Sequence, residues 1–172
     1  MGEQNKEIEQ EKETIDYFAY GSNLLTARIQ IGIPSARDPR VGRLDGYRFD
    51  FQGSSSRWNG ATANIVTEDS SVVLGVVWRI NVSDVANLDA QEVKYRPITV
   101  NVRVGDSTVI CRTYVQIENG GSTKPSLAYK TVVLKGAIEH NLDAEYIEKL
   151  RRFPDNGVNQ CGQSSLSSLV HE

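Results

Sequence analysis

Alternation of hydrophobic and polar positions is the clearest pattern in the chain, and it predicts β-strands. Residues 98–104 alternate strictly, as expected for a strand with one buried face and one solvent-facing side. Gly105-Asp106-Ser107 is a turn sequence that leads into a second strand at 109–117, so the two segments predict an antiparallel hairpin. Further strands are predicted at residues 15–20, 44–51, 61–66 and 72–80.

Helical spacing of apolar residues occurs between and after these strands. Helices are predicted at residues 23–29, 83–88 and 126–138, and a last one between Asp143 and Pro154. Asp143 is the best marked helix start, because Leu142 and Ile147 flank it as a hydrophobic staple. Pro34 and Pro39 indicate a loop after the first helix.

These elements predict a single α+β domain built on a mostly antiparallel, barrel-like sheet with flanking helices. Residues 1–13 are polar and charged, and we expect them to form a flexible lead-in. The domain is predicted to span residues 14–154. Residues 155–172 are polar and rich in serine, which is typical of a mobile tail.

Composition narrows the class of protein. Hydrophobic residues make up 39% of the 172 positions and charged residues 24%, a balance typical of a globular domain. The net charge of −3 and the absence of a basic stripe disfavour nucleic acid as a partner. No apolar run has the length of a signal peptide or a membrane span, so we expect a soluble, cytoplasmic protein without membrane contact. Cys111 and Cys161 are expected to be free thiols in that compartment.

Several common chemistries lack their residues in this chain. His140 and His171 are the two histidines, and neither has a partner at metal-ligand spacing, which disfavours a zinc site or a Ser–His–Asp triad. The glycine motifs of nucleotide-binding loops are also missing. An enzyme with this sequence would therefore work without a metal or other cofactor, and carboxylates would carry its protons.

Two segments remain as candidates for chemistry. The first is Tyr17-Phe18-Ala19-Tyr20-Gly21-Ser22-Asn23, where a predicted strand runs into a glycine turn and then into a helix. Backbone N–H groups at such a turn form an anion site, and glycine lets a ligand approach closely. The plainer alternative is a strand–turn–helix connection with Ser22 or Asn23 as the cap.

The second segment is Leu88-Asp89-Ala90-Gln91-Glu92, which ends the predicted helix ahead of the strand at 98–104. A lone glutamate is ordinarily a solvated surface charge. Glu92 becomes a candidate proton carrier because the histidine, metal and nucleotide chemistries are disfavoured.

The combination of FAYGSNL at residues 18–24 with LDAQE at residues 88–92 resembles the γ-glutamylcyclotransferase family. Gly75-Val76-Val77-Trp78, Tyr95, Pro125-Ser126 and Tyr129 extend the resemblance over roughly residues 15–150. It implies a cofactor-free enzyme that converts γ-glutamyl-amino acids to 5-oxoproline and a free amino acid. The substrate's own α-amine would attack its γ-carbonyl. Dimers occur in the family, so the resemblance leaves a homodimer possible, and the sequence does not give the oligomeric state.

The resemblance also assigns roles to residues. It implies Glu92 as the general acid–base and the turn at residues 17–23 as the binding site for the γ-glutamyl group. Tyr95 and Tyr129 are candidates to line the pocket, although each could equally be a core tyrosine with a hydrogen-bonded hydroxyl.

One departure leaves the substrate open. Typical members have a longer, glycine-containing segment between the glutamate and the tyrosine matched by Tyr95, whereas here only Val93 and Lys94 intervene. A γ-glutamylamine cyclotransferase acting on γ-glutamyl-lysine isopeptides is therefore the alternative enzyme. A non-catalytic ligand-binding descendant is a third interpretation, but Glu92 argues against it, because a second carboxylate weakens binding of a carboxylate. A structural module that binds partners through its two termini is the fourth.

Overall fold

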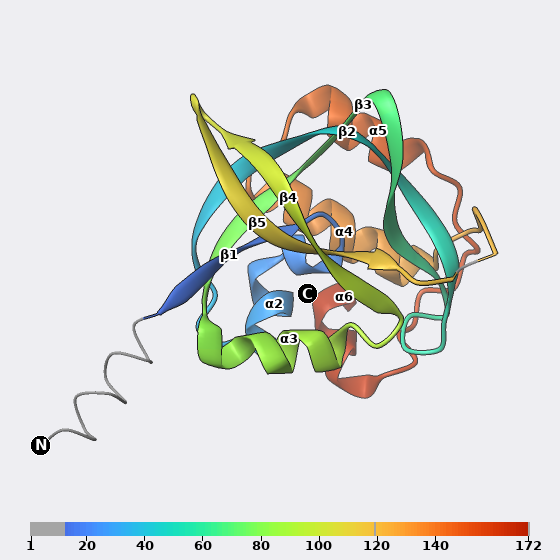
Figure 1. Cartoon of the computed structure of the whole chain (residues 1–172). Coiled ribbons are helices and arrows are strands. Elements are labelled where there is room, and N and C mark those ends of the chain that lie inside the picture. The colour runs from blue at the N-terminus through green and yellow to red at the C-terminus, as the bar shows by residue number, and fades with distance from the viewer. Residues whose placement is uncertain (1–12, 119, 172) are drawn as a thin grey trace, which may run out of the picture.

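The sheet is a closed barrel, which confirms the predicted α+β fold class. The computed structural model describes residues 13–118 and 120–171, so the predicted lead-in lies almost wholly outside the described residues. Five strands follow in the spatial order β1-β3-β2-β4-β5, and neighbours pair antiparallel except where β5 closes against β1 at Tyr17 and Arg112 (Figure 1). The strands are β1 (Thr14–Ala19), β2 (Arg37–Ser55), β3 (Gly60–Asn81), β4 (Tyr95–Val104) and β5 (Ser107–Gln116).

β2 and β3 form one long hairpin, although the sequence predicts two separate strands where β3 lies. Asp45 pairs with Val72 and Tyr47 with Thr67, so β3 carries extra residues opposite this point of β2. The intervening polar residues 68–71 are exposed or nearly so, and the register shift lets the strand continue past them. The polarity of residues 68–71 predicts a break between two strands, but in the structure these residues form a bulge within β3.

The predicted loop around Pro34 and Pro39 is shorter than expected, because β2 already begins at Arg37. Pro39 lies between the paired residues Arg37 and Arg40, where the register shifts and Asp38 has φ 54°. Proline cannot donate to a β-ladder and is tolerated at such irregular positions.

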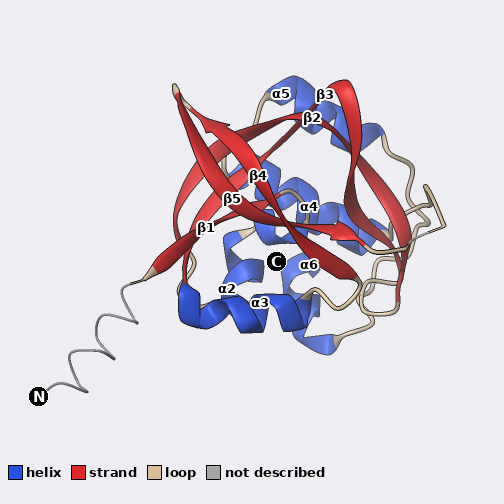
Figure 2. Cartoon of the chain, in the orientation of Figure 1, coloured by secondary structure: helices blue, strands red, loops and turns tan. Residues whose placement is uncertain are grey.

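Five helices of the described residues cover the barrel (Figure 2). Figure 2 shows α2, α3 and α6 grouped at the lower side of the molecule and α5 at the upper side. The Ser126 and Asp143 side chains cap α4 and α5 by accepting the Tyr129 and Tyr146 amides, so both predicted helix starts are confirmed. The helices are α2 (Thr26–Gly32), α3 (Val85–Gln91), α4 (Leu127–Glu139), α5 (Ala144–Arg152) and α6 (Ser167–His171).

The two short helices predicted at 23–29 and 83–88 both begin differently from the prediction. A 3-10 turn (Ser22–Leu24) and an extended Leu25 precede α2, and a second 3-10 turn (Val82–Asp84) precedes α3. The first turn is pressed against α4, since a Cβ on Gly136 would lie 2.5 Å from the Leu25 nitrogen. Tertiary packing therefore overrides the local helical pattern here.

The barrel interior is filled by large apolar side chains, among them Phe18, which is fully buried. Glycine is required beside it, because a Cβ on Gly75 would lie 2.2 Å from the Ala19 carbonyl oxygen.

No helix in the described ranges has the length and hydropathy needed to cross a membrane. Cys111 and Cys161 are free thiols, as predicted.

The C-terminal segment packs on the domain, in contrast to the expected mobile tail. Leu166 is 1% exposed, and Leu169 and Val170 are buried with it. The Lys135 ammonium donates to the Leu169 carbonyl oxygen at 2.7 Å, which ties α6 to α4. A short apolar pattern inside a serine-rich stretch is therefore sufficient to attach this segment.

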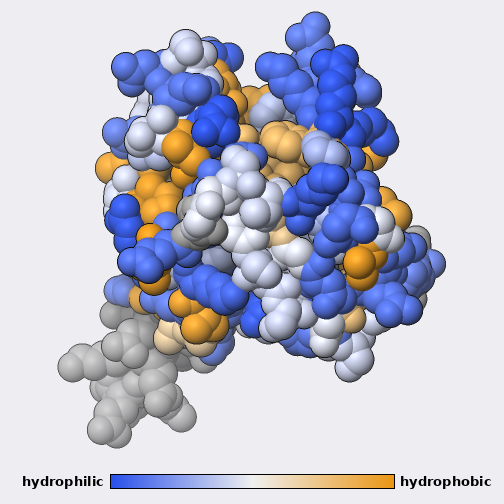
Figure 3. Space-filling view, turned by 90° about the vertical axis from the view of Figure 1, so that its right-hand side faces the viewer, coloured by the Kyte–Doolittle hydropathy of each residue, from blue (hydrophilic) through white to orange (hydrophobic). Residues whose placement is uncertain are grey.

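The face viewed in Figure 3 is mainly hydrophilic, with hydrophobic residues in small scattered groups.

Candidate active site

A cavity of about 490 Å³ opens between the turn after β1, the tip of the β2–β3 hairpin, α3 and the C-terminal segment. Tyrosines and charged side chains dominate its lining. The lining residues are Tyr17, Tyr20, Gly21, Ser22, Asn23, Arg28, Ser55, Ser56, Arg57, Trp58, Thr62, Ala63, Gln91, Glu92, Val93, Lys94, Tyr95, Tyr114, Tyr129, Gly162 and Gln163.

The structure brings together all of the predicted site residues except Phe18 and Ala19. Phe18 points into the barrel core, and Ala19 is 1% exposed. Their assignment to substrate binding is therefore corrected: these two residues build the barrel that supports the turn. Tyr17 and Tyr20, on either side of them, line the pocket.

Gly21 is required for close packing against the barrel. A Cβ at this position would lie 2.9 Å from the Ala63 Cβ and 3.0 Å from the Tyr129 hydroxyl. The absence of a side chain thus lets the turn lie directly on the barrel wall.

Glu92 occupies the C-terminal end of α3, where the chain turns back into the barrel. Its amide donates to the Leu88 carbonyl oxygen at 3.1 Å, and its own carbonyl accepts from the Tyr95 amide at 3.0 Å. The two residues between Glu92 and Tyr95 therefore form a tight turn. Both of them, Val93 and Lys94, border the cavity.

The environment of the Glu92 carboxyl group suits proton transfer near neutral pH. Burial raises its pKa to about 7, and the positive charges of Arg28 and Arg57 oppose this rise. The Asn23 amide nitrogen lies 3.5 Å from Glu92 Oε1, which aims the carboxyl group at the turn that follows β1. Asn23 is itself held by Trp78, whose indole donates to the Asn23 carbonyl oxygen at 2.9 Å.

The pocket tyrosines are both lining residues and parts of the barrel scaffold, which answers the open question about Tyr95 and Tyr129. The Tyr95 hydroxyl donates to the Ala63 carbonyl oxygen at 2.6 Å, and the Tyr129 hydroxyl accepts from the Ala63 amide at 2.9 Å. Burial raises the pKa of both hydroxyls, and the charge on Glu92 adds to this. Both hydroxyls consequently stay protonated, and their hydrogen bonds to Ala63 hold the walls of the cavity in place.

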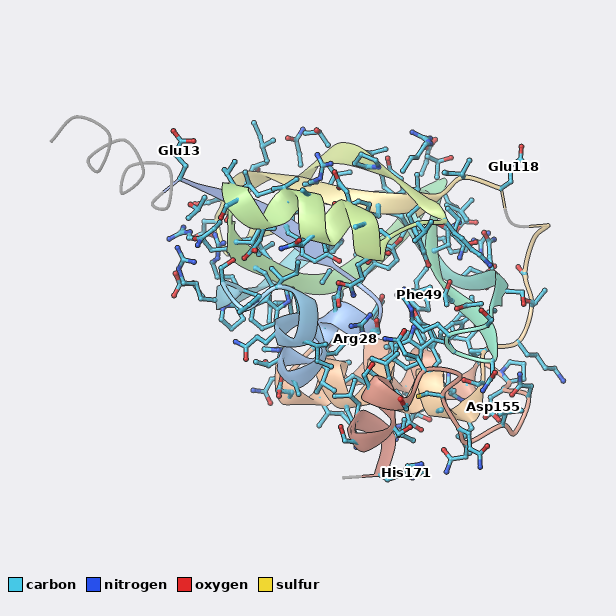
Figure 4. The ribbon with its side chains drawn as sticks, turned by 90° about the horizontal axis from the view of Figure 1, so that it is seen from below. Glu13, Arg28, Phe49, Glu118, Asp155 and His171 are labelled. Atoms are coloured by element: carbon cyan, nitrogen blue, oxygen red, sulfur yellow. The ribbon has the colours of Figure 1, made fainter. Side chains whose placement is uncertain are left out.

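Arg28, Arg57, Trp58 and Gln91 also line the pocket, and sequence reasoning missed them. Arg28 is 5% exposed and its guanidinium lies 5.7 Å from the centre of the Trp58 ring. Figure 4 labels Arg28, which extends from α2 toward the C-terminal segment. An arginine in a short amphipathic helix is ordinarily solvent-exposed, so the sequence carries no signal for its burial.

Asp89, in the same motif as Glu92, fastens α3 to β5. Its carboxylate accepts from Arg112 Nη2 at 2.8 Å and from the Tyr114 hydroxyl. Burial would raise the pKa of Asp89, but these hydrogen bonds from Tyr114 and Arg112 outweigh it and lower the pKa. The motif at residues 88–92 thus combines the Asp89 carboxylate, which anchors α3, with the Glu92 carboxyl group, which lies in the cavity.

The C-terminal segment forms one wall of the cavity through Gly162 and Gln163. The Gly162 amide donates to the Arg57 carbonyl oxygen at 2.8 Å, so this segment lies against the tip of the β2–β3 hairpin. Over the described residues, no three His, Cys, Asp or Glu side chains gather closely enough to hold a metal ion.

Replacing Gly162 with alanine should disturb this wall, since a Cβ there would lie 1.9 Å from the Ser56 carbonyl oxygen. We expect Gly162→Ala to lower the free energy of unfolding by about 1–3 kcal/mol. Urea denaturation measures the loss, and Gln160→Ala, at an exposed position in the same segment, is the control. Equal stability of Gly162→Ala and wild type would mean that the segment does not pack as described.

The closed barrel thus carries a cavity that holds a carboxyl group of near-neutral pKa together with two arginines. Comparisons with known proteins identify the family of this fold. The AIG2-like family model matches residues 72–150. γ-Glutamylcyclotransferase of Mus musculus is 43% identical over 86% of this chain and 82% of its own. The Homo sapiens enzyme of that name is 42% identical over 93% and 89%.

The structural similarity extends over nearly the whole chain, as the sequence similarity does. A solved γ-glutamyl cyclotransferase superposes with a TM-score of 0.87 at 35% identity, covering 92% of this chain and 99% of that one. The chain therefore belongs to the γ-glutamylcyclotransferase family, and it is an enzyme of that family.

Proposed function

We propose that this protein converts γ-glutamyl-amino acids to 5-oxoproline and a free amino acid, with Glu92 as the general acid–base. The observation that carries the proposal is the position of Glu92: it lies in the pocket with a pKa near 7 and faces the turn at Tyr20 to Asn23. The curated relatives that bear this activity in their names align over most of the chain.

The reaction begins with proton removal. The ionised Glu92 carboxylate takes a proton from the substrate's α-ammonium group, which frees a lone pair on that nitrogen. The nitrogen attacks the γ-carbonyl carbon of the same molecule and closes a five-membered ring. Because nucleophile and electrophile belong to one bound molecule, positioning contributes much of the rate.

The second half releases the amino acid. The ring nitrogen still carries a second proton after the attack and gives it up as the lactam forms. The bond between the γ-carbonyl carbon and the leaving nitrogen breaks, Glu92 returns its proton to that nitrogen, and the released amine takes up the second proton to become an ammonium group. The carboxylate is thereby regenerated and no water or cofactor is consumed. A pKa of about 7 suits both tasks, because a carboxyl group with an ordinary pKa would be a weak base at neutral pH.

The turn after β1 supports the γ-glutamyl group in this proposal. Backbone N–H groups of Gly21, Ser22 and Asn23 would hold its α-carboxylate or the oxyanion that develops on the γ-carbonyl. The Leu24 and Leu25 amides already bond the Gly21 and Ser22 carbonyls within the turn, which makes the amide positions rigid. Preorganised donors are the effective ones, because they need no rearrangement during the reaction.

A γ-glutamylamine cyclotransferase that releases lysine from its isopeptide is the second candidate. The observation that favours it is the tight turn from Glu92 to Tyr95, which replaces the longer segment of typical members. Because this turn borders the cavity, it would contact the leaving group in either case.

Release of 5-oxoproline from γ-glutamyl-alanine and from the γ-glutamyl-lysine isopeptide tests both candidates. We expect turnover of γ-glutamyl-alanine with the wild-type protein. Turnover of the isopeptide alone would favour the second candidate. Binding of both compounds without release of 5-oxoproline from either would contradict both and indicate a ligand-binding role.

A further inference from the structure

Arg28 and Arg57 line the pocket and form no ion pair within the described part of the chain, and Glu92 is the carboxyl group whose pKa both of their charges lower. No carboxylate lies within 4.0 Å of either guanidinium among residues 13–118 and 120–171. Arg28 is 5% exposed, and a buried charge is costly unless it is paired. Glu92 carries at most one negative charge against two guanidinium groups, so the two arginines leave the cavity a positive charge that an anion from outside the chain can balance.

Arg28 is held rigidly in place. It stacks on Trp58, and Gln91, with its amide oxygen turned toward the guanidinium, accepts from Arg28 Nη2 at 2.6 Å and from Nη1 at 3.2 Å. The buried Nε, in contrast, has no hydrogen-bond partner. A fixed guanidinium with an unused donor is preorganised to receive a carboxylate.

Arg57 approaches the same point from the tip of the β2–β3 hairpin. Its Nη1 lies 3.4 Å from the Gln91 carbonyl oxygen, so both arginines meet at the residue that precedes Glu92. Burial, and then the charge of Arg57, lower the pKa of Arg28, and the charge of Glu92 only partly opposes them. Mutual repulsion of this kind is relieved when an anion binds between the two cations.

The third cation at the pocket, Lys94, is already engaged. Its ammonium donates to the Ser54 carbonyl oxygen at 2.6 Å, and the residue is exposed. Arg28 and Arg57 are therefore the cations best placed to meet an anion inside the cavity.

A γ-glutamyl-amino acid carries two carboxylates. The proposed function assigns the glutamyl carboxylate, or the oxyanion, to amides of the turn at Gly21 to Asn23. The other carboxylate belongs to the departing amino acid and is one carbon away from the leaving nitrogen. Glu92 must reach that nitrogen, and Gln91, the adjacent residue, contacts both arginines.

We propose that Arg28 and Arg57 bind the α-carboxylate of the departing amino acid and so select substrates that have one. This inference rests on the proposed function and names the substrate class of the same site. Leaving groups without a carboxylate next to the nitrogen would be disfavoured. In a lysine isopeptide the carboxylate lies several carbons farther from the leaving nitrogen, so the arginine pair also favours the first candidate over the second.

The test compares γ-glutamyl-alanine with γ-glutamyl-alaninamide, in which the α-carboxylate of the leaving group is replaced by a neutral amide. In wild type we expect the acid to have the higher kcat/KM. In Arg57→Gln and Arg28→Gln the ratio of the two kcat/KM values should fall by about 10–100-fold, the effect of losing a charge-assisted hydrogen bond. Intrinsic reactivity cancels in this comparison, since the same two substrates are used throughout.

Arg57→Lys should restore part of the preference, because it keeps the charge but loses the fork of donors. Arg103→Gln, with 61% of its side chain exposed on β4, is the matched control and should leave the ratio unchanged. If both substrates lose activity by the same factor, the arginines hold the glutamyl end or the fold, and the inference is overturned.

Calorimetry on the Glu92→Gln protein gives a readout that does not need turnover. We expect tighter binding of the acid than of the amide, and loss of that difference when Arg57→Gln is added. Equal affinity for the two compounds, or binding of neither, would overturn the inference. Failure of the proposed function alone would appear differently, as selective binding of the acid with no release of 5-oxoproline by wild type.

Discussion

Replacing Glu92 with glutamine is expected to lower kcat by about 100–10,000-fold, the contribution of a positioned general acid–base. Glutamine has nearly the same shape as glutamate but neither accepts the substrate's proton nor returns it to the leaving nitrogen. The backbone bonds that hold position 92, to Leu88 and Tyr95, do not depend on the side chain. Release of 5-oxoproline from γ-glutamyl-alanine measures the loss.

The control is Glu118→Gln, which removes the same charge from an exposed residue at the periphery of the molecule (Figure 4). It should retain wild-type activity. A folded Glu92→Gln protein with activity within tenfold of wild type would rule out Glu92 as the proton carrier.

The same substitution should make the protein more stable above neutral pH. The pKa of Glu92 is about 7 in the fold against an ordinary value of 4.5 for a glutamate, and each pKa unit corresponds to about 1.4 kcal/mol. The stability that neutral Glu92 contributes is complete below pH 4.5 and is lost as pH rises through 7. Above that, wild type carries a buried charge that Glu92→Gln lacks.

Urea denaturation at pH 5 and pH 8 tests this linkage. The difference in unfolding free energy between Glu92→Gln and wild type should increase by about 2–3 kcal/mol in favour of the variant as pH rises. Glu118→Gln should show no such change. An unchanged difference would mean that the Glu92 carboxyl group is not buried. A variant that is inactive yet more stable is the expected signature of a site where function requires a costly charge.

Much of the barrel was predictable because strand alternation reports local burial directly. The hairpin of β4 and β5 follows from residues 98–117, and the caps Ser126 and Asp143 mark two helices correctly. Errors occurred where packing between distant segments overrides the local pattern. The bulge at residues 68–71 reads as a break between strands, and Leu25 interrupts a helical pattern because its turn is pressed against α4.

The sequence by itself determined the family, most of the strand pattern and the candidate glutamate, because motifs and alternation depend on residue types and their spacing along the chain. Only the tertiary structure decided that Phe18 and Ala19 belong to the core and that the C-terminal segment walls the pocket. It also decided that Arg28 and Arg57 meet at Gln91. Burial and uncompensated charge depend on segments that are distant in sequence, so no local pattern reports them.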